Sequence, residues 1–126
     1  MTRPPNELVA LVTGSTDGIG KQTAIALARA GARVIVHGRG EATAARAADE
    51  VRTASGSDRV DHVAFDLSSL AAVRKGAAAV AARTPALHVL VNNAGIFASE
   101  RVTSTDGYEL TLAVNHLGPF QLTALL

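Results

Sequence analysis

The sequence predicts an α/β fold with a doubly wound parallel sheet, and three observations support this prediction. Short apolar runs alternate with longer alanine-rich segments, which is the βαβ pattern of a parallel sheet covered by helices on both faces. A glycine-rich turn, residues 13–20, joins the first apolar run to the first helical segment. Polar residues directly follow the third and fourth apolar runs, beginning at Asp66 and Asn92.

Four strands are expected where apolar and β-branched residues run together. They span residues 8–13, 33–37, 60–65 and 88–92. The second contains Val34, Ile35 and Val36 in succession, and an unbroken apolar run of this kind is typical of a strand buried on both faces. The fourth is expected at the edge of the sheet. Its unpaired backbone groups would favour pairing with another chain, so a homo-oligomer is one predicted state.

Four helices are expected between and after these strands. They span residues 18–30, 41–54 and 69–83, with a last helix from residue 105 or 106 toward residue 126. Gly31 is a natural stop for the first helix, and Ser68 is suited to cap the third. In the last helix a kink is expected at Gly118-Pro119, because proline lacks the N–H of a continuous helix. That helix ends on apolar residues with no C-cap, so we expect it to be cut short rather than finished at residue 126.

Composition excludes several classes of protein. The 126 residues suit one domain or part of one, and 48% hydrophobic with 18% charged residues indicates a globular chain. The net charge of +1 gives no attraction to nucleic acid. Without cysteine, and with four histidines that lack partners at metal-ligand spacing, no disulfide or metal site is expected. The chain has no apolar run of about 20 residues and no secretory signal, so no membrane span and a soluble, cytoplasmic protein are predicted.

The turn at residues 13–20 has the spacing Gly-x-x-x-Gly-x-Gly between a strand and a helix, a context that favours dinucleotide binding. Glycine lets the backbone turn tightly and approach a pyrophosphate closely. The helix that follows directs free N–H groups and its positive dipole end toward the phosphates. The residues expected to bind there are Gly14, Ser15, Thr16, Asp17, Gly18, Ile19 and Gly20.

With Thr13 before it, this spacing resembles the glycine motif of the short-chain dehydrogenase/reductase family. Three further segments match the family in order and spacing: Asp66-Leu67, the sequence Asn92-Asn93-Ala94-Gly95, and Asn115. The matches extend over nearly the whole chain, and the stretches at residues 106–109 and 114–118 look most like the retinol-dehydrogenase-like branch.

The resemblance implies a Rossmann-type NAD(P)-binding domain over residues 1–126, with strand order three-two-one-four. It also implies individual roles. Asp66, with Leu67 beside it, would lie against the adenine, and Asn93, Ala94 and Gly95 would line the cofactor. From the residues alone, the competing interpretations are a helix cap for Asp66 and a polar strand exit for Asn92 and Asn93.

The residues at the end of the second strand indicate whether the cofactor is NAD(H) or NADP(H). Proteins of this architecture that bind NAD place an acidic residue there, against the ribose 2′-hydroxyl. This chain has Gly38 at that position, then Arg39, and no acid before Glu41. A guanidinium suits a 2′-phosphate, so NADP(H) is preferred, with NAD(H) as the alternative. An exposed, solvated arginine is the competing interpretation of Arg39.

The resemblance assigns one catalytic residue, Asn115, as the helix asparagine of the family's tetrad. The tetrad also needs a Ser and a Tyr-x-x-x-Lys pair, in which the lysine lowers the pKa of the tyrosine. The single tyrosine, Tyr108, has Leu112 four residues on, and neither Lys21 nor Lys75 is preceded by tyrosine at that spacing. The domain is therefore expected to be truncated before the catalytic Ser and Tyr-x-x-x-Lys, and the chain alone to be inactive.

The function predicted is the NADP(H)-binding portion of an oxidoreductase. Such an enzyme transfers a hydride between the nicotinamide and a small-molecule carbonyl or alcohol substrate. Two alternatives stay open: a non-catalytic dinucleotide-binding module, and an inactive truncated remnant. Flavin or S-adenosylmethionine binding remains open on fold grounds alone, although the Asn-Asn-Ala-Gly match argues against both.

Overall fold

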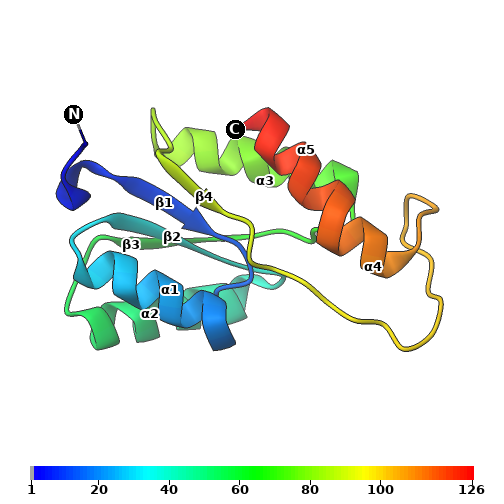
Figure 1. The fold of residues 1–126 in the computed structure, drawn as a ribbon, viewed down its shortest axis with the longest axis horizontal. Helices are drawn as coiled ribbons and strands as arrows, with labels where there is room; N and C mark the ends of the chain where they lie inside the picture. Colours follow the sequence, from blue (N-terminus) through cyan, green and yellow to red (C-terminus); the bar gives the residue numbers. More distant parts are fainter. Residues whose placement is uncertain (1) are drawn as a thin grey trace.

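A computed structural model describes residues 2–126, and a four-stranded parallel sheet lies at its centre (Figure 1). The strands are β1 (Val9–Val12), β2 (Arg33–Gly38), β3 (Val60–Ala64) and β4 (Val89–Val91). Their order is β3-β2-β1-β4, and every neighbouring pair is parallel. The predicted doubly wound sheet and its strand order are confirmed.

Helices cover the two faces of the sheet (Figure 1). One face carries α1 (Gly18–Arg29) and α2 (Glu41–Ser55). The other carries α3 (Leu70–Arg83) and α5 (Gly118–Leu125), and α5 is preceded by the short α4 (Leu110–Leu112) and the π-helical segment η2 (Ala113–Leu117). A 3₁₀ turn, η1 (Pro5–Glu7), precedes β1.

The continuous apolar runs of the strands follow from burial on both faces. Side chains alternate across a strand, so Val34 and Val36 join the core under α1 and α2, while Ile35 joins the core under α3 and α5. All three are fully buried. A strand with one wet face would alternate apolar and polar residues, whereas these strands need apolar residues at every position.

The third helix begins one residue later than the sequence indicated. Its N-cap is Ser69, whose Oγ accepts a hydrogen bond from the Ala72 N–H at 3.2 Å. Ser68 is unavailable as a cap because its N–H and Oγ both donate to Asp66 Oδ1, at 2.9 and 2.7 Å. The prediction for Ser68 is therefore wrong, and the Asp66 turn is the reason.

The last helix also begins later, at Leu110 and not at residue 105 or 106. Residues 103–109 form a small loop closed by a bridge between Thr103 and Glu109, and Gly107 has a φ of 87°, which no right-handed helix contains. Glu109 caps α4, accepting from the Thr111 and Leu112 N–H groups at 2.7 and 2.9 Å. A carboxylate cap of this kind fixes the helix start at the residue after it.

The irregularity expected at Gly118-Pro119 takes the form of the wider π-helical turn η2, directly before α5. The Gly118 N–H donates to the Ala113 carbonyl, five residues back. Pro119 has no N–H to donate, so a regular α-helical ladder is interrupted there. No helix within residues 2–126 is long and apolar enough to cross a membrane.

Candidate dinucleotide site

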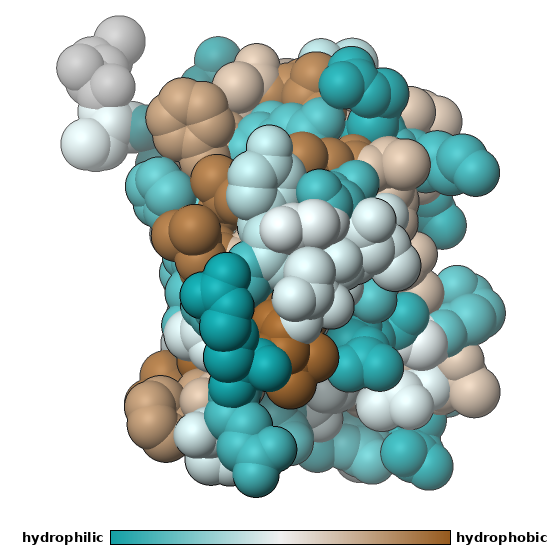
Figure 2. All heavy atoms as spheres, turned by 90° about the vertical axis from the view of Figure 1, so that its right-hand side faces the viewer, coloured by the Kyte–Doolittle hydropathy of each residue, from teal (hydrophilic) through white to brown (hydrophobic). Residues whose placement is uncertain are grey.

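A pocket of about 580 Å³ opens at the carboxyl ends of the strands. Its wall combines the β1–α1 loop, the segments that follow β2, β3 and β4, and two side chains of the last helical region, Leu110 and Val114. Figure 2 looks onto this end of the molecule, where hydrophilic and hydrophobic patches lie next to each other. Ligands of open parallel sheets bind at this position, outside the strand ends where the chain order reverses.

The glycines of the β1–α1 loop are required by its geometry. Gly14 and Gly18 have φ values of 59° and 54°, which other residues rarely adopt. A Cβ on Gly14 would come within 2.8 Å of Ala94 Cα, and a Cβ on Gly20 would overlap the Asn93 amide and the Gly14 carbonyl. The loop therefore lies tightly against the end of β4.

Thr13 and Asn93 join the ends of β1 and β4. The fully buried Thr13 accepts hydrogen bonds at Oγ1 from the N–H groups of Asn93 and Ala94, both at 3.0 Å. Asn93 Nδ2 in turn donates to the carbonyls of Thr13 and Gly14, at 3.0 and 3.1 Å. The sequence offered no physical signal for this role of Thr13, because its partners are 80 and 81 residues away.

Most residues predicted to bind the cofactor line the pocket, and Ser15 is the exception. Ser15 is fully buried beneath the loop, where Oγ donates to the Val12 carbonyl at 2.7 Å and accepts from the His37 N–H at 3.0 Å. The structure therefore gives Ser15 a supporting position under the loop. The predicted residues that line the pocket are Gly14, Thr16, Asp17, Gly18, Ile19, Gly20, Arg39, Asp66, Leu67, Asn93, Ala94 and Gly95.

His37 also lines the pocket, a position that the sequence did not predict, since it only excluded a metal site at the four histidines. It is 3% exposed, and its ring bonds to two other segments of the site. Nδ1 accepts from the Gly14 N–H at 3.0 Å, and Nε2 lies 2.9 Å from the Phe65 carbonyl oxygen. Burial lowers the pKa of this histidine, opposed by the hydrogen bond to Phe65 and by the charge of Asp66.

The end of β2 shapes one wall of the pocket. A Cβ on Gly38 would lie 2.5 Å from Thr16 Cγ2, so a larger residue at position 38 would displace Thr16. Arg39 follows, with an exposed side chain that lines the pocket. Within residues 2–126 no carboxylate forms a salt bridge with Arg39.

Asp66 lies at the end of β3 and faces the same pocket. One of its oxygens, Oδ1, accepts both hydrogen bonds from Ser68 and so turns the chain toward α3. Asp66 thus forms the turn before α3, but it is not the N-cap of that helix, which is Ser69. Leu67 beside it is buried in the core under α3.

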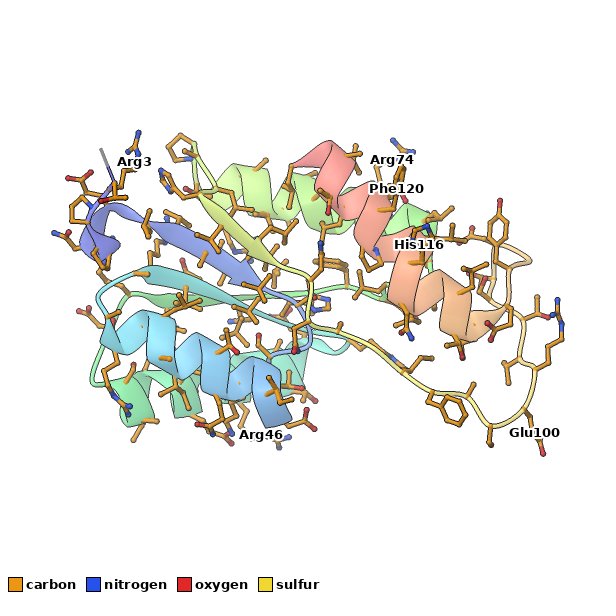
Figure 3. The ribbon with its side chains drawn as sticks, viewed as in Figure 1. Arg3, Arg46, Arg74, Glu100, His116 and Phe120 are labelled. Atoms are coloured by element: carbon orange, nitrogen blue, oxygen red, sulfur yellow. The ribbon has the colours of Figure 1, made fainter. Side chains whose placement is uncertain are left out.

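Asn115 lies outside the residues that line this pocket. It comes from η2 and bonds to the segment that follows β4, with Oδ1 accepting from the Ile96 N–H and Nδ2 donating to the Ile96 carbonyl, both at 2.8 Å. Beyond Ile96, the chain extends away from the sheet toward Glu100 (Figure 3). Asn92, by contrast, points to α5 and donates to Thr123 Oγ1 at 3.1 Å.

Comparison with known proteins identifies the family. A family model described as short chain dehydrogenase matches residues 8–126. The chain belongs to this family. Its members are oxidoreductases that use nicotinamide cofactors, and the predicted family is confirmed.

Curated relatives include dehydrogenase/reductase SDR family member 13 of Homo sapiens, 46% identical over 93% of this chain and 30% of the relative. Polyprenol dehydrogenase of Mus musculus is 47% identical over 94% of this chain and 35% of its own. Retinol dehydrogenase 11 of Homo sapiens is 42% identical over 94% of this chain and 37% of its own, in agreement with the predicted branch. The chain thus spans about a third of the length of the curated relatives it matches.

Solved structures of the family share the fold. Gluconate 5-dehydrogenase from Burkholderia cenocepacia, in complex with NADP and tartrate, superposes with a TM-score of 0.76 at 36% identity. It covers 94% of this chain, which corresponds to 47% of that protein. A 3-ketoacyl-(acyl-carrier-protein) reductase from Brucella melitensis, complexed with NADH, gives a TM-score of 0.76 at 30% identity, over 94% of this chain and 48% of its own.

Proposed function

We propose that this chain is the NADP(H)-binding portion of an oxidoreductase that transfers a hydride between a nicotinamide cofactor and a carbonyl or alcohol carbon. The observation that carries the proposal is the pocket at the strand ends, which joins the glycine loop, Arg39, Asp66 and the Asn93–Gly95 segment in one cavity. Each of these segments was expected to bind a different part of one dinucleotide.

The loop fits a pyrophosphate. A Cβ on Gly18 would meet no atom within 4 Å, so there is open space above the first turn of α1. No side chain of residues 2–126 caps the start of this helix, which leaves its first N–H groups available to an anion. We assign the pyrophosphate to Gly14, Thr16, Asp17, Gly18, Ile19 and Gly20, with Ser15 supporting the loop from below.

With the pyrophosphate at the glycine loop, the remaining pocket residues are left for the other parts of the cofactor. Asp66, whose second carboxylate oxygen is not engaged by Ser68, would accept a hydrogen bond from the adenine amine, with Leu67 beside it. Ala94 and Gly95 would let the backbone approach the ribose and adenine, held in place by Asn93. When bound, the cofactor supplies or accepts the hydride, and this chain's residues bind and orient it.

The preference for NADP(H) rests on this chain's own residues, since the solved relatives hold NADP in one case and NADH in another. An acidic side chain at position 38, of the kind that recognises a 2′-hydroxyl, would have to displace the Thr16 side chain. Arg39 is exposed at the pocket wall and has no carboxylate partner among the described residues. Its guanidinium is therefore available to a 2′-phosphate.

The substrate side is supported by two kinds of observation. The relatives include a retinol dehydrogenase and a polyprenol dehydrogenase, whose names specify apolar alcohols. In this chain Ile96 and Phe97 are exposed directly after Gly95, and Phe97 is 90% exposed. An apolar alcohol or ketone is the substrate class that such a surface favours. Asn115 would act by holding Ile96, and so the segment beside the reacting centre.

Binding of oxidised cofactors, measured by isothermal titration calorimetry, tests the proposal. The chain is expected to bind NADP⁺ more tightly than NAD⁺. Arg39→Gln should weaken NADP⁺ binding by about 10- to 100-fold, the worth of one charge-assisted hydrogen bond, and leave NAD⁺ binding nearly unchanged. Arg46→Gln, an exposed arginine of α2 outside the pocket, is the control. Failure to bind either cofactor, or an unchanged cofactor ratio in Arg39→Gln, would overturn the proposal.

A non-catalytic binding module is the second candidate, because the 126 residues contain no Tyr-x-x-x-Lys pair. We infer that the chain alone binds the cofactor without turning it over. Oxidation of NADPH by the purified chain, in the presence of an apolar aldehyde or ketone, should not exceed the rate without protein. A protein-dependent rate would contradict this inference and would require another proton donor within these residues.

A further inference from the structure

The His37 ring connects three segments of the pocket that are distant in sequence. Nδ1 accepts the Gly14 N–H of the glycine loop at 3.0 Å, and Nε2 lies 2.9 Å from the Phe65 carbonyl, one residue before Asp66. The backbone of His37 also pairs with Ser15, accepting from its N–H and donating to its Oγ, both at 3.0 Å. The ring packs on Phe65, with centroids 4.2 Å apart.

These contacts permit one protonation state of the ring. Gly14 presents an N–H, so Nδ1 must be an unprotonated acceptor, and Phe65 presents a carbonyl, so Nε2 must carry the proton. Only the neutral Nε2–H tautomer satisfies both partners. A proton on Nδ1 would face the Gly14 N–H and remove that hydrogen bond at a site that is 3% exposed.

We propose that His37 is a positioning residue of the dinucleotide site, whose neutral ring fixes the glycine loop to the end of β3 and whose protonation releases it. The inference rests on the proposed function, because the loop and the end of β3 hold the pyrophosphate and adenine there. It goes further in assigning a role to a side chain that bonds the Gly14 N–H of the loop and lies away from the reacting atoms. Cofactor affinity should therefore fall in acid as the ring takes up a proton.

The charged groups around the ring set the direction of this effect. Burial lowers the pKa of His37, while the Phe65 hydrogen bond and Asp66 raise it again. Two further charged residues line the same pocket: Asp17 in the glycine loop, and Arg39, two residues after His37. Because burial favours the neutral ring, the pKa of His37 lies below its ordinary value, and the loss of affinity is expected on the acidic side of that value.

Two substitutions separate the contacts of the ring. His37→Asn places an oxygen acceptor near the position of Nδ1, so it retains the bond to Gly14 but cannot titrate. His37→Leu removes both ring contacts and any titration. His62→Asn is the matched control, because His62 lies on the neighbouring β3, pairs with the exposed Glu41 and does not line the pocket.

Calorimetric titration with NADP⁺ and NAD⁺ from about pH 7.5 down to about pH 4 tests the inference, because it starts above the range in which unperturbed histidine titrates and extends below it. Wild type should lose about tenfold more affinity across this range than His37→Asn, which corresponds to one pK unit of linkage. Titration of the 2′-phosphate affects both proteins equally, so it cancels when their pH profiles are compared. His62→Asn should show the pH profile of wild type. Equal pH profiles for wild type and His37→Asn would overturn the inference.

The Gly14 amide provides a readout that needs neither cofactor binding nor a variant. In wild type, its NMR chemical shift should follow the same pH transition as the His37 ring and should move little at pH values above it. A Gly14 amide that ignores the titration of His37 contradicts the inference, whatever the cofactor does. Absence of binding near pH 7.5 together with a coupled Gly14 titration would instead refute the proposed function and leave the positioning contact standing.

Discussion

Asn115 holds the backbone of Ile96 at both polar atoms, with Oδ1 accepting from its N–H and Nδ2 donating to its carbonyl, each at 2.8 Å. A side-chain amide thus pairs with the chain as a neighbouring strand would. The contact ties η2 to the segment after β4, directly beside Gly95 at the pocket.

Asn115→Ala should therefore loosen this segment without unfolding the chain. Asn115 is exposed, so we expect a loss of about 1 kcal/mol in the free energy of unfolding, the usual net worth of such hydrogen bonds. The Ile96 amide should exchange with deuterium faster in the variant. Asn92→Ala, which removes one exposed bond to Thr123, is the control and should leave Ile96 exchange unchanged. Unchanged Ile96 protection in Asn115→Ala would contradict the holding role.

Gly14 and Gly18 allow conformational strain to be separated from close packing. Both have positive φ, but a Cβ on Gly18 meets nothing within 4 Å, whereas a Cβ on Gly14 would press on Ala94. Gly18→Ala should cost about 1–2 kcal/mol from backbone strain alone. Gly14→Ala should cost the same strain and about 1–3 kcal/mol more from overpacking.

Urea denaturation of the two variants measures the difference. Calorimetry with NADP⁺ should show weaker binding in Gly14→Ala even under conditions where it remains folded, because the loop must move away from Ala94. Equal destabilisation of the two variants would mean that the loop moves easily and that its contact with β4 has little energetic weight.

The strands and the pocket-lining segments were predictable because each depends on local sequence. Buried parallel strands require apolar runs such as Val34–Val36, and the glycine spacing at 14–20 specifies a turn before a helix. Both are readable without knowing what packs against them. The confirmed sheet order came from the family resemblance, since crossovers between distant strands leave no local trace in composition.

The predictions that were wrong or missing have a different cause, which is the choice of hydrogen-bond partners by polar side chains. Ser68 and Ser69 are equally good caps in sequence, and the carboxylate of Asp66 decides between them. His37 was one of four histidines with no distinguishing neighbour, and its role depends on partners 23 and 28 residues away. Ser15 lies within the motif, yet its side chain points to the Val12 carbonyl beneath the loop.

Glu109 should make the last helical region sensitive to acid. Its hydrogen bonds from the Thr111 and then the Leu112 N–H lower the pKa of this carboxyl below its usual value of 4.5. Because the folded-state pKa is depressed, the stabilisation is present above the unfolded pKa and is lost as pH falls through the folded one. Glu109→Gln should be less stable than wild type at neutral pH, and the two should converge in acid.

Thermal unfolding of both proteins from neutral pH down to about pH 3 checks this expectation, which spans the titration of a carboxyl. Glu100→Gln, at the tip of the segment before α4, is the control for a general loss of negative charge (Figure 3). A gap between Glu109→Gln and wild type that stays constant with pH would show that the carboxylate's charge does not stabilise the start of the helix.

Thr16 should determine whether an acidic residue at position 38 can convert the cofactor preference. Gly38→Asp supplies the carboxylate that recognises a ribose 2′-hydroxyl, but its Cβ would lie 2.5 Å from Thr16 Cγ2. The single variant should therefore lose NADP⁺ affinity through charge repulsion without gaining affinity for NAD⁺. Thr16→Ser removes only that methyl group, so the double variant should bind NAD⁺ about tenfold more tightly than wild type, as one added hydrogen bond allows.

Calorimetry on the four members of this double-mutant cycle measures the coupling directly. Thr16→Ser alone is expected to change NADP⁺ binding little, because the hydroxyl and the backbone of the loop are retained. The coupling between positions 16 and 38 should then appear only for NAD⁺, since contacting residues are not additive. If Gly38→Asp alone binds NAD⁺ as tightly as the double variant, Thr16 yields freely, and Arg39 rather than the crowding at Gly38 sets the preference.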